Sequence, residues 1–264
     1  MEGKHWRGDT RAGLGRRPRG GSLARIASAL GAGGTPSRLQ VAFGGLAFST
    51  DGRSVSAIGY VPREQVRWRT WQIDDGQQVV AHDVNAQPYL GNWPSGEPSH
   101  SPLGEAFSPD GKLLALGTID RIHLVDMATA NVIRKLDIVG GPTRSIAFSP
   151  DGKTLAAGTD SGGELYAWET SSGKQLCRMT VTDKPNWLRV AFSPDGRWLA
   201  VCSRSAQPST LRVWDAKAWT QLLQRHYESS RLSCLAFSPD GERLALGMYD
   251  GTIELLDLQS VEQE

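Results

Sequence analysis

The chain has 264 residues, a net charge of +1 and 39% hydrophobic residues, so it is long enough to bury a substantial core. The near-zero charge gives no global field that would favour nucleic acid or a membrane surface as a partner. Thirty glycines and 14 prolines indicate a turn-rich, all-β protein rather than a helical one. The sequence contains no run of 18 or more apolar residues and therefore predicts no membrane span.

The first 38 residues differ from the rest of the chain. They carry eight Lys or Arg against two acidic residues and show little hydrophobic periodicity, which is typical of a disordered basic tail. Three other interpretations stay open. The charge could contact nucleic acid or an acidic surface. Arg16-Arg17 followed by the apolar stretch Leu23–Leu30 could be a short, interrupted export signal, or that stretch could dock on the rest of the chain as a strand or short helix.

From residue 39 onward, one six-residue stretch repeats along the chain. Ala-Phe-Ser-Pro-Asp-Gly occurs four times unchanged and is preceded by one degenerate copy. The phenylalanines of the five copies are 59, 41, 44 and 45 residues apart. A period in the low forties indicates a repeat architecture. The five phenylalanines are Phe48, Phe107, Phe148, Phe192 and Phe237.

Each copy of this stretch is predicted to be the turn of a β-hairpin. Pro presets φ for the second turn position, Asp can bond the local backbone, and Gly supplies the positive φ that closes the turn. Apolar residues alternate on both sides, with Ile146 and Phe148 before one turn and Leu155 and Ala157 after it. This period of two indicates strands. Backbone geometry therefore explains the repeated aspartates better than proton transfer does.

The chain after the tail divides into five units, each expected to hold four antiparallel strands. The third strand of each unit ends with an apolar residue and then an acid, as in Trp214-Asp215. In the last unit the fourth strand is missing or vestigial. The predicted units are residues 39–83, 103–139, 140–183, 184–229 and 230–264, with a proline-rich insertion loop at 84–102.

Phe-Ser-Pro-Asp-Gly, Leu-Ala-x-Gly and Leu-x-x-Trp-Asp at this period resemble the WD-repeat (β-transducin-like) family of β-propellers, most closely at Leu211–Asp215. The resemblance covers residues 39–258 and implies an all-β propeller of about five four-stranded antiparallel blades. The chain departs from the family pattern because the usual Gly-His is absent, five units replace the commoner seven, and the last unit lacks its outer strand. A closed ring of five blades, an open arc and a fragment of a longer propeller all stay open.

No motif for nucleophilic, acid–base, phosphate-binding or metal chemistry is found in the sequence. We therefore expect a non-enzymatic protein with no catalytic residues, no cofactor and no metal site. The three cysteines, Cys177, Cys202 and Cys234, fall in predicted strands without CxxC spacing. This pattern is typical of buried thiols in a reducing compartment, and the expected location is cytoplasmic.

The family resemblance implies a rigid scaffold that binds protein or peptide partners through strand entries and loops. Arg, Trp and Tyr are the residue types that most often dominate interface energies. Carried over by position, the candidates are Arg144, Trp187 and Arg231 at strand entries, Arg63, Arg121, Arg204 and Tyr249 in the loops between second and third strands, and Trp93 in the insertion.

The expected function is thus a protein–protein interaction scaffold. One alternative is a sensor or regulatory module, or a fragment of a larger multidomain protein, for example beside a kinase domain. Another alternative is an exported propeller. Nucleic-acid binding would depend on the basic tail alone, and self-association is expected if the propeller is open.

Overall fold

The computed structural model describes residues 42–48, 53–61, 65–85, 104–182, 187–204 and 208–259. Every regular element in these ranges is a β-strand, and the 19 strands form five antiparallel sheets. Four sheets have four strands and the last has three. This architecture confirms the expected all-β class and its four-stranded antiparallel sheets. The basic tail, Arg63, Trp93 and most of the expected insertion loop lie outside the described residues.

Each sheet is a meander in which strands that are neighbours in sequence also pair. The strands of the first sheet are β1 (Ala42–Phe48), β2 (Ser54–Val61), β3 (Gln65–Gln72) and β4 (Gln78–Asn85). Those of the second are β5 (Gly104–Phe107), β6 (Leu113–Gly117), β7 (Arg121–Asp126) and β8 (Val132–Asp137). Those of the third are β9 (Thr143–Phe148), β10 (Thr154–Thr159), β11 (Glu164–Glu169) and β12 (Gln175–Thr180).

The remaining strands complete the array. The fourth sheet contains β13 (Leu188–Phe192), β14 (Trp198–Ser203), β15 (Ser209–Asp215) and β16 (Gln221–Tyr227). The fifth contains β17 (Leu232–Phe237), β18 (Arg243–Met248) and β19 (Ile253–Asp257). At one predicted boundary the structure differs, because β4 continues to Asn85 and so enters the segment expected to be a loop. The other limits given above for the tail and the units remain predictions.

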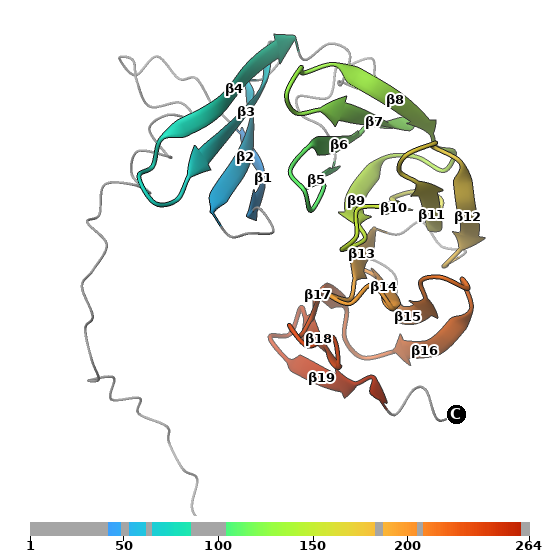
Figure 1. Cartoon of the computed structure of the whole chain (residues 1–264). Coiled ribbons are helices and arrows are strands. Elements are labelled where there is room, and N and C mark those ends of the chain that lie inside the picture. Colours follow the sequence, from blue (N-terminus) through green and yellow to red (C-terminus); the bar gives the residue numbers. More distant parts are fainter. Residues whose placement is uncertain are drawn as a thin grey trace, which may run out of the picture.

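The five sheets follow one another in an arc, with the first strand of each sheet on the inner side (Figure 1). The inner strands β5, β9, β13 and β17 contact one another in succession. The first and fifth sheets stand at the two ends of the arc (Figure 1). Among the described residues, no apolar cluster joins these two sheets.

The core lies between successive sheets rather than inside any one of them. Between the second and third sheets, Leu124 and Leu155 pack with Trp168, and none of the three is more than 2% exposed. Between the third and fourth sheets, Leu165 packs in the same cluster as Trp214. Similar clusters join the first sheet to the second and the fourth to the fifth. Because one blade cannot bury both of its faces, stacking on neighbours is what stabilises each sheet.

The repeated Ser-Pro-Asp-Gly stretch forms the turn between the first two strands of a sheet. In the third sheet, Ser149 Oγ donates to Asp151 Oδ1 (2.6 Å) and accepts from Thr154 N (2.9 Å). Lys153 N also donates to Asp151 Oδ1 (3.0 Å), and Gly152 takes a φ of 69°. The same bonds recur in the turns of the second, fourth and fifth sheets. The turn aspartates thus stabilise the backbone conformation of the turn by accepting hydrogen bonds.

These turn bonds lower the pKa of the Asp151 carboxyl, chiefly through the Ser149 hydroxyl and then through the Lys153 amide. We expect Ser149→Ala to raise the pKa of Asp151 toward its ordinary value, because the ionised carboxylate loses its closest donor. An NMR titration of the Asp151 carboxyl measures the change. Ser161→Ala, in an exposed loop, is the control and should leave that pKa where it is. An unchanged Asp151 pKa in Ser149→Ala would contradict the role given to the hydroxyl.

Buried thiols and one buried histidine lie within the strands. Cys177 and Cys202 are buried, and burial raises the pKa of their thiols to about 11 and about 12. The expectation of buried cysteines is wrong for Cys234, which is exposed on β17. The His123 ring on β7 is 4% exposed, and burial lowers its pKa to about 4.

The low pKa of His123 predicts a loss of stability in acid. Since the fold favours the neutral ring, its contribution is complete above the ordinary pKa of 6.5 and is lost as the pH falls toward 4. We expect this residue to remove up to about 3 kcal/mol of unfolding free energy between pH 7 and pH 4. Urea denaturation at several pH values measures the loss, which should be smaller in His123→Leu. Equal losses in the two proteins would show that His123 is not responsible.

Candidate protein-binding site

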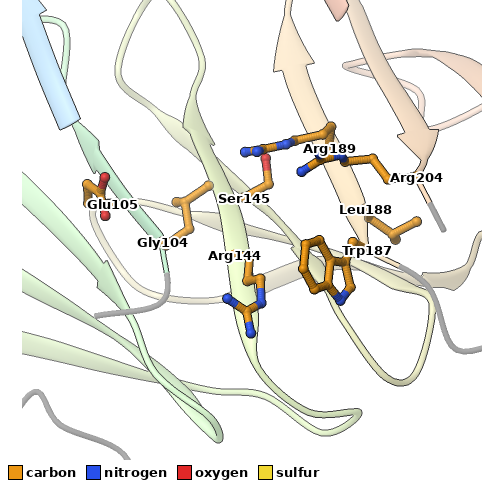
Figure 2. Close-up of a pocket in the computed structure, with 9 residues that line it drawn as sticks. Gly104, Glu105, Arg144, Ser145, Trp187, Leu188, Arg189 and Arg204 are labelled. Atoms are coloured by element: carbon orange, nitrogen blue, oxygen red, sulfur yellow. The ribbon is translucent and has the colours of Figure 1, made fainter. Parts of the chain in front are cut away.

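A cavity of about 310 Å³ lies where the first strands of the second, third and fourth sheets begin (Figure 2). Strand β5 of the second sheet and strand β9 of the third sheet form part of its wall. The fourth sheet contributes the start of β13 and the residue that follows β14. Its lining residues are Gly104, Glu105, Arg144, Ser145, Ile146, Trp187, Leu188, Arg189 and Arg204.

The inner strands come unusually close together at this end of the sheets. A Cβ atom on Gly104 would lie 2.7 Å from the carbonyl carbon of Arg144, so only glycine allows β5 to approach β9 this closely. On the neighbouring strand β10, a Cβ atom on Gly158 would lie 2.6 Å from the Cβ of Leu188 at the junction with β13. Across the same junction, Val190 N donates to Ser145 Oγ (3.0 Å). These contacts fix the cavity walls on rigid strands.

The Trp187 side chain is the centre of a cluster of arginine and aromatic groups. The Arg144 Cζ lies 4.8 Å from the Trp187 ring centroid and the Arg204 Cζ lies 5.6 Å from it. Figure 2 shows the Trp187 ring beside the Arg144 side chain. Arg204 also lies over the Tyr249 ring at 5.7 Å and donates from Nη2 to its hydroxyl (2.8 Å). Such contacts hold the cations in place.

One buried carboxylate anchors this cluster. Arg144 Nε donates to Asp160 Oδ2, and Asp160 is 7% exposed. Its other oxygen, Oδ1, is buried and has no hydrogen-bond partner in the described part of the chain. Burial raises the pKa of Asp160, although the charges of Arg144, Arg189 and Arg204 oppose that rise. The carboxylate therefore sits in a field made by three arginines.

The arrangement favours an anionic ligand. The side chain of Arg144 is engaged by Asp160 and that of Arg204 by Tyr249. The Arg189 side chain is exposed, and its guanidinium makes no hydrogen bond within the residues that the structure describes. A guanidinium presents a planar fork of donors that matches a carboxylate or a phosphate. Because Arg144 and Arg204 already lie over the Trp187 ring, less of that ring is left for a stacked base. An acidic group therefore suits the cavity better than a nucleobase.

The structure brings together four of the residues named from the sequence: Arg144, Trp187, Arg204 and Tyr249. Two other candidates lie elsewhere. Arg121 is paired with Asp120 through its Nη2 at 2.5 Å. Arg231 accepts a hydrogen bond from Tyr249 N on its backbone carbonyl (2.9 Å), but its side chain is not part of the cavity wall. Arg63 and Trp93 fall outside the described residues.

Sequence reasoning missed two residues of this site, Arg189 and Asp160. The Asp160 carboxylate accepts a hydrogen bond from Arg144 Nε. Arg189 follows Trp187 by two residues at the start of β13, and side chains two apart share one face of an extended chain. That spacing is the signal that could have found it.

The described residues contain no group of three or more His, Cys, Asp or Glu placed to hold a metal ion. In the same part of the chain, no helix has the length and apolar character needed to cross a membrane.

Four-stranded antiparallel meanders stacked blade by blade define a protein of the β-propeller class. Residues 190–263 match the family described as Anaphase-promoting complex subunit 4 WD40 domain, and residues 137–169 match the family WD domain, G-beta repeat. Together with the relatives below, these matches show that the chain is similar to proteins of the WD-repeat family over these residues.

Similar proteins share the repeats over part of their length. WD repeat-containing protein 91 of Gallus gallus is 31% identical over 124 residues, which cover 38% of this chain and 16% of that protein. Telomerase protein component 1 of Mus musculus is 29% identical over 156 residues, which cover 59% of this chain and 6% of that protein. The matched part of this chain thus spans less than a fifth of the length of either relative.

A solved structure supports the fold independently. Kuenenia stuttgartiensis Hydrazine Synthase aligns with a TM-score of 0.58 at 20% identity, over 77% of this chain and 54% of that chain. At this identity the likeness shows the fold alone.

Proposed function

We propose that this chain is a non-enzymatic interaction scaffold that binds an acidic segment of a partner protein in the cavity around Trp187. WD-repeat proteins generally mediate protein interactions, which supports the general role. The observation that carries the finer proposal is a cavity lined by Arg144, Arg189 and Arg204 together with the exposed Trp187, over whose ring Arg144 and Arg204 lie.

Rigid placement of these arginines favours binding. Arg144 is fixed by Asp160, and Arg204 by Tyr249, so both side chains are ordered before a ligand arrives. A preorganised site loses less conformational entropy when it binds. Arg189 is then the side chain that can rotate to pair with a carboxylate of the ligand. Trp187, which is 43% exposed, packs against the apolar part of the ligand next to that carboxylate.

A selection from a random peptide display library tests this proposal with the whole chain as bait. We expect the enriched peptides to share Asp or Glu next to an apolar residue. Binding of a selected peptide to Arg189→Glu should be at least about tenfold weaker, because a fixed attraction becomes a repulsion. Lys217→Glu is the matched control: it makes the same charge change in the turn after β15, at the opposite end of the sheet from Arg204.

Two results would contradict the proposal. Enriched peptides without acidic residues would show that the cavity does not select an anion. Equal weakening by Arg189→Glu and Lys217→Glu would show that net charge, and not this cavity, governs binding.

The location of this activity is a separate proposal. We place it in the cytoplasm, where thiols stay reduced, since Cys177, Cys202 and Cys234 are all free. Fractionation of cells that express the chain, with detection in the soluble or exported fraction, tests this directly.

A further inference from the structure

Each sheet in the arc has two faces that pack on different neighbours. We call the face toward the next sheet along the chain the forward face, and the opposite one the rear face. In the second sheet the forward face carries Ala115, Ile122 and Leu124, and each is 0% exposed. The rear face of the third sheet covers them with large side chains, among them Leu155 and Trp168.

The fifth sheet repeats this forward face almost residue for residue. In the second sheet Ala115 pairs with Leu124, and Gly117 pairs with Ile122. At the corresponding positions of the fifth sheet, Ala245 pairs with Leu255, and Gly247 pairs with Ile253. Cys234 and Ala236 of β17 complete the same face. The fifth forward face is therefore the set Cys234, Ala236, Ala245, Ile253 and Leu255.

The same residue types are buried in one sheet and exposed in the other. Ile253 is 71% exposed and Leu255 is 64% exposed, whereas Ile122 and Leu124 are 0% exposed. The forward faces of the second, third and fourth sheets are all covered by the sheet that follows. β19, which carries both exposed residues, lies at an end of the arc (Figure 1). Clustered exposed apolar side chains mark an interaction surface.

We infer that the fifth forward face is the docking surface for a further β-blade of a partner polypeptide. That blade presents a rear face of aromatic and leucine side chains in the pattern of Phe148, Leu155 and Trp168. The four inter-sheet interfaces within the chain supply the pattern, and the new contact continues their series.

The first sheet of this chain, or of a second copy, does not fit as the occupant. Its rear face carries Val55, Ala57 and Trp71. Val55 pairs with Trp71 as Leu155 pairs with Trp168 on the rear face of the third sheet. Ala57 is 1% exposed and Trp71 is 3% exposed, so neither side chain is accessible to a docking sheet. A head-to-tail pair of copies would moreover stack ten sheets, beyond the four to eight blades typical of propellers.

The test adds a duplicate of one of the chain's own sheets, whose rear face can pack on the fifth forward face. The chain is extended after Gln259 by a flexible linker and a duplicate of residues 140–182, whose rear face covers the second sheet. We expect the extension to raise Tm by about 4 °C or more, because it buries Ile253 and Leu255.

Point variants separate docking from a general effect of the added sequence. Leu255→Asp should change the Tm of the unextended chain by less than about 2 °C, because the side chain is exposed. In the extended chain it should abolish the gain. Ile133→Asp, at a residue that is 52% exposed on β8, is the control and should leave the gain intact. A second extension, a duplicate of residues 184–229, guards against failure of the first duplicate to fold.

Three results would overturn the inference. The first is that neither extension raises Tm, and the second is that the gain in Tm survives Leu255→Asp. The third is that light scattering of the unextended chain finds a dimer that Leu255→Asp dissociates. The last result would assign the fifth forward face to a second copy.

Discussion

Trp214→Ala is expected to lower the free energy of unfolding by about 3–5 kcal/mol. Trp214 is 2% exposed and lies between the third and fourth sheets, in a cluster with Leu165, Val190 and Leu199. Truncation would leave a cavity in the interface between the third and fourth sheets, where Trp214 packs against Leu165 and its neighbours. Urea denaturation followed by circular dichroism measures the loss.

A second tryptophan provides the control for this experiment. Trp187 is 43% exposed, so Trp187→Ala should cost less than about 1 kcal/mol of stability. A loss under about 1 kcal/mol for Trp214→Ala as well would mean that the sheets do not stack through this surface.

Trp187→Ala is expected instead to weaken binding of a selected acidic peptide by about 2 kcal/mol, or about thirtyfold. The ring supports Arg144 at 4.8 Å and Arg204 at 5.6 Å, so its removal frees both guanidiniums as well as deleting apolar contact area. Isothermal titration calorimetry measures the affinity. Trp187→Phe keeps an aromatic face and should recover part of the loss. Unchanged affinity in Trp187→Ala would remove the ring from the binding site.

The fold was largely predictable because its determinants are local and repeated. Ser149, Asp151 and Gly152 form their turn through bonds within six residues, and the same bonds recur in three other sheets. The alternation of apolar residues around each turn predicts which side chains are buried, as for Leu155.

The candidate site was only partly predictable because it depends on contacts between residues that lie far apart in the sequence. Arg204 meets Tyr249 across 45 residues, and Arg144 meets Asp160 across 16. The residue types and loop positions suggested Arg144 and Arg204, but nothing in their spacing separates them from Arg121, whose guanidinium is paired with its neighbour Asp120. The exposure of Cys234 was missed for a related reason, since a strand pattern does not tell whether another sheet covers it.

A charge exchange between the cavity and its ligand tests the proposed recognition most directly. A selected peptide is remade with its essential acidic residue replaced by lysine, and both peptides are titrated into wild type and Arg189→Glu. We predict that the acidic peptide binds only wild type and that the lysine peptide regains binding to Arg189→Glu, because the attraction is restored with reversed signs. Failure of the lysine peptide to discriminate between the two proteins would contradict an ion pair at Arg189 and, with it, acidic recognition in this cavity.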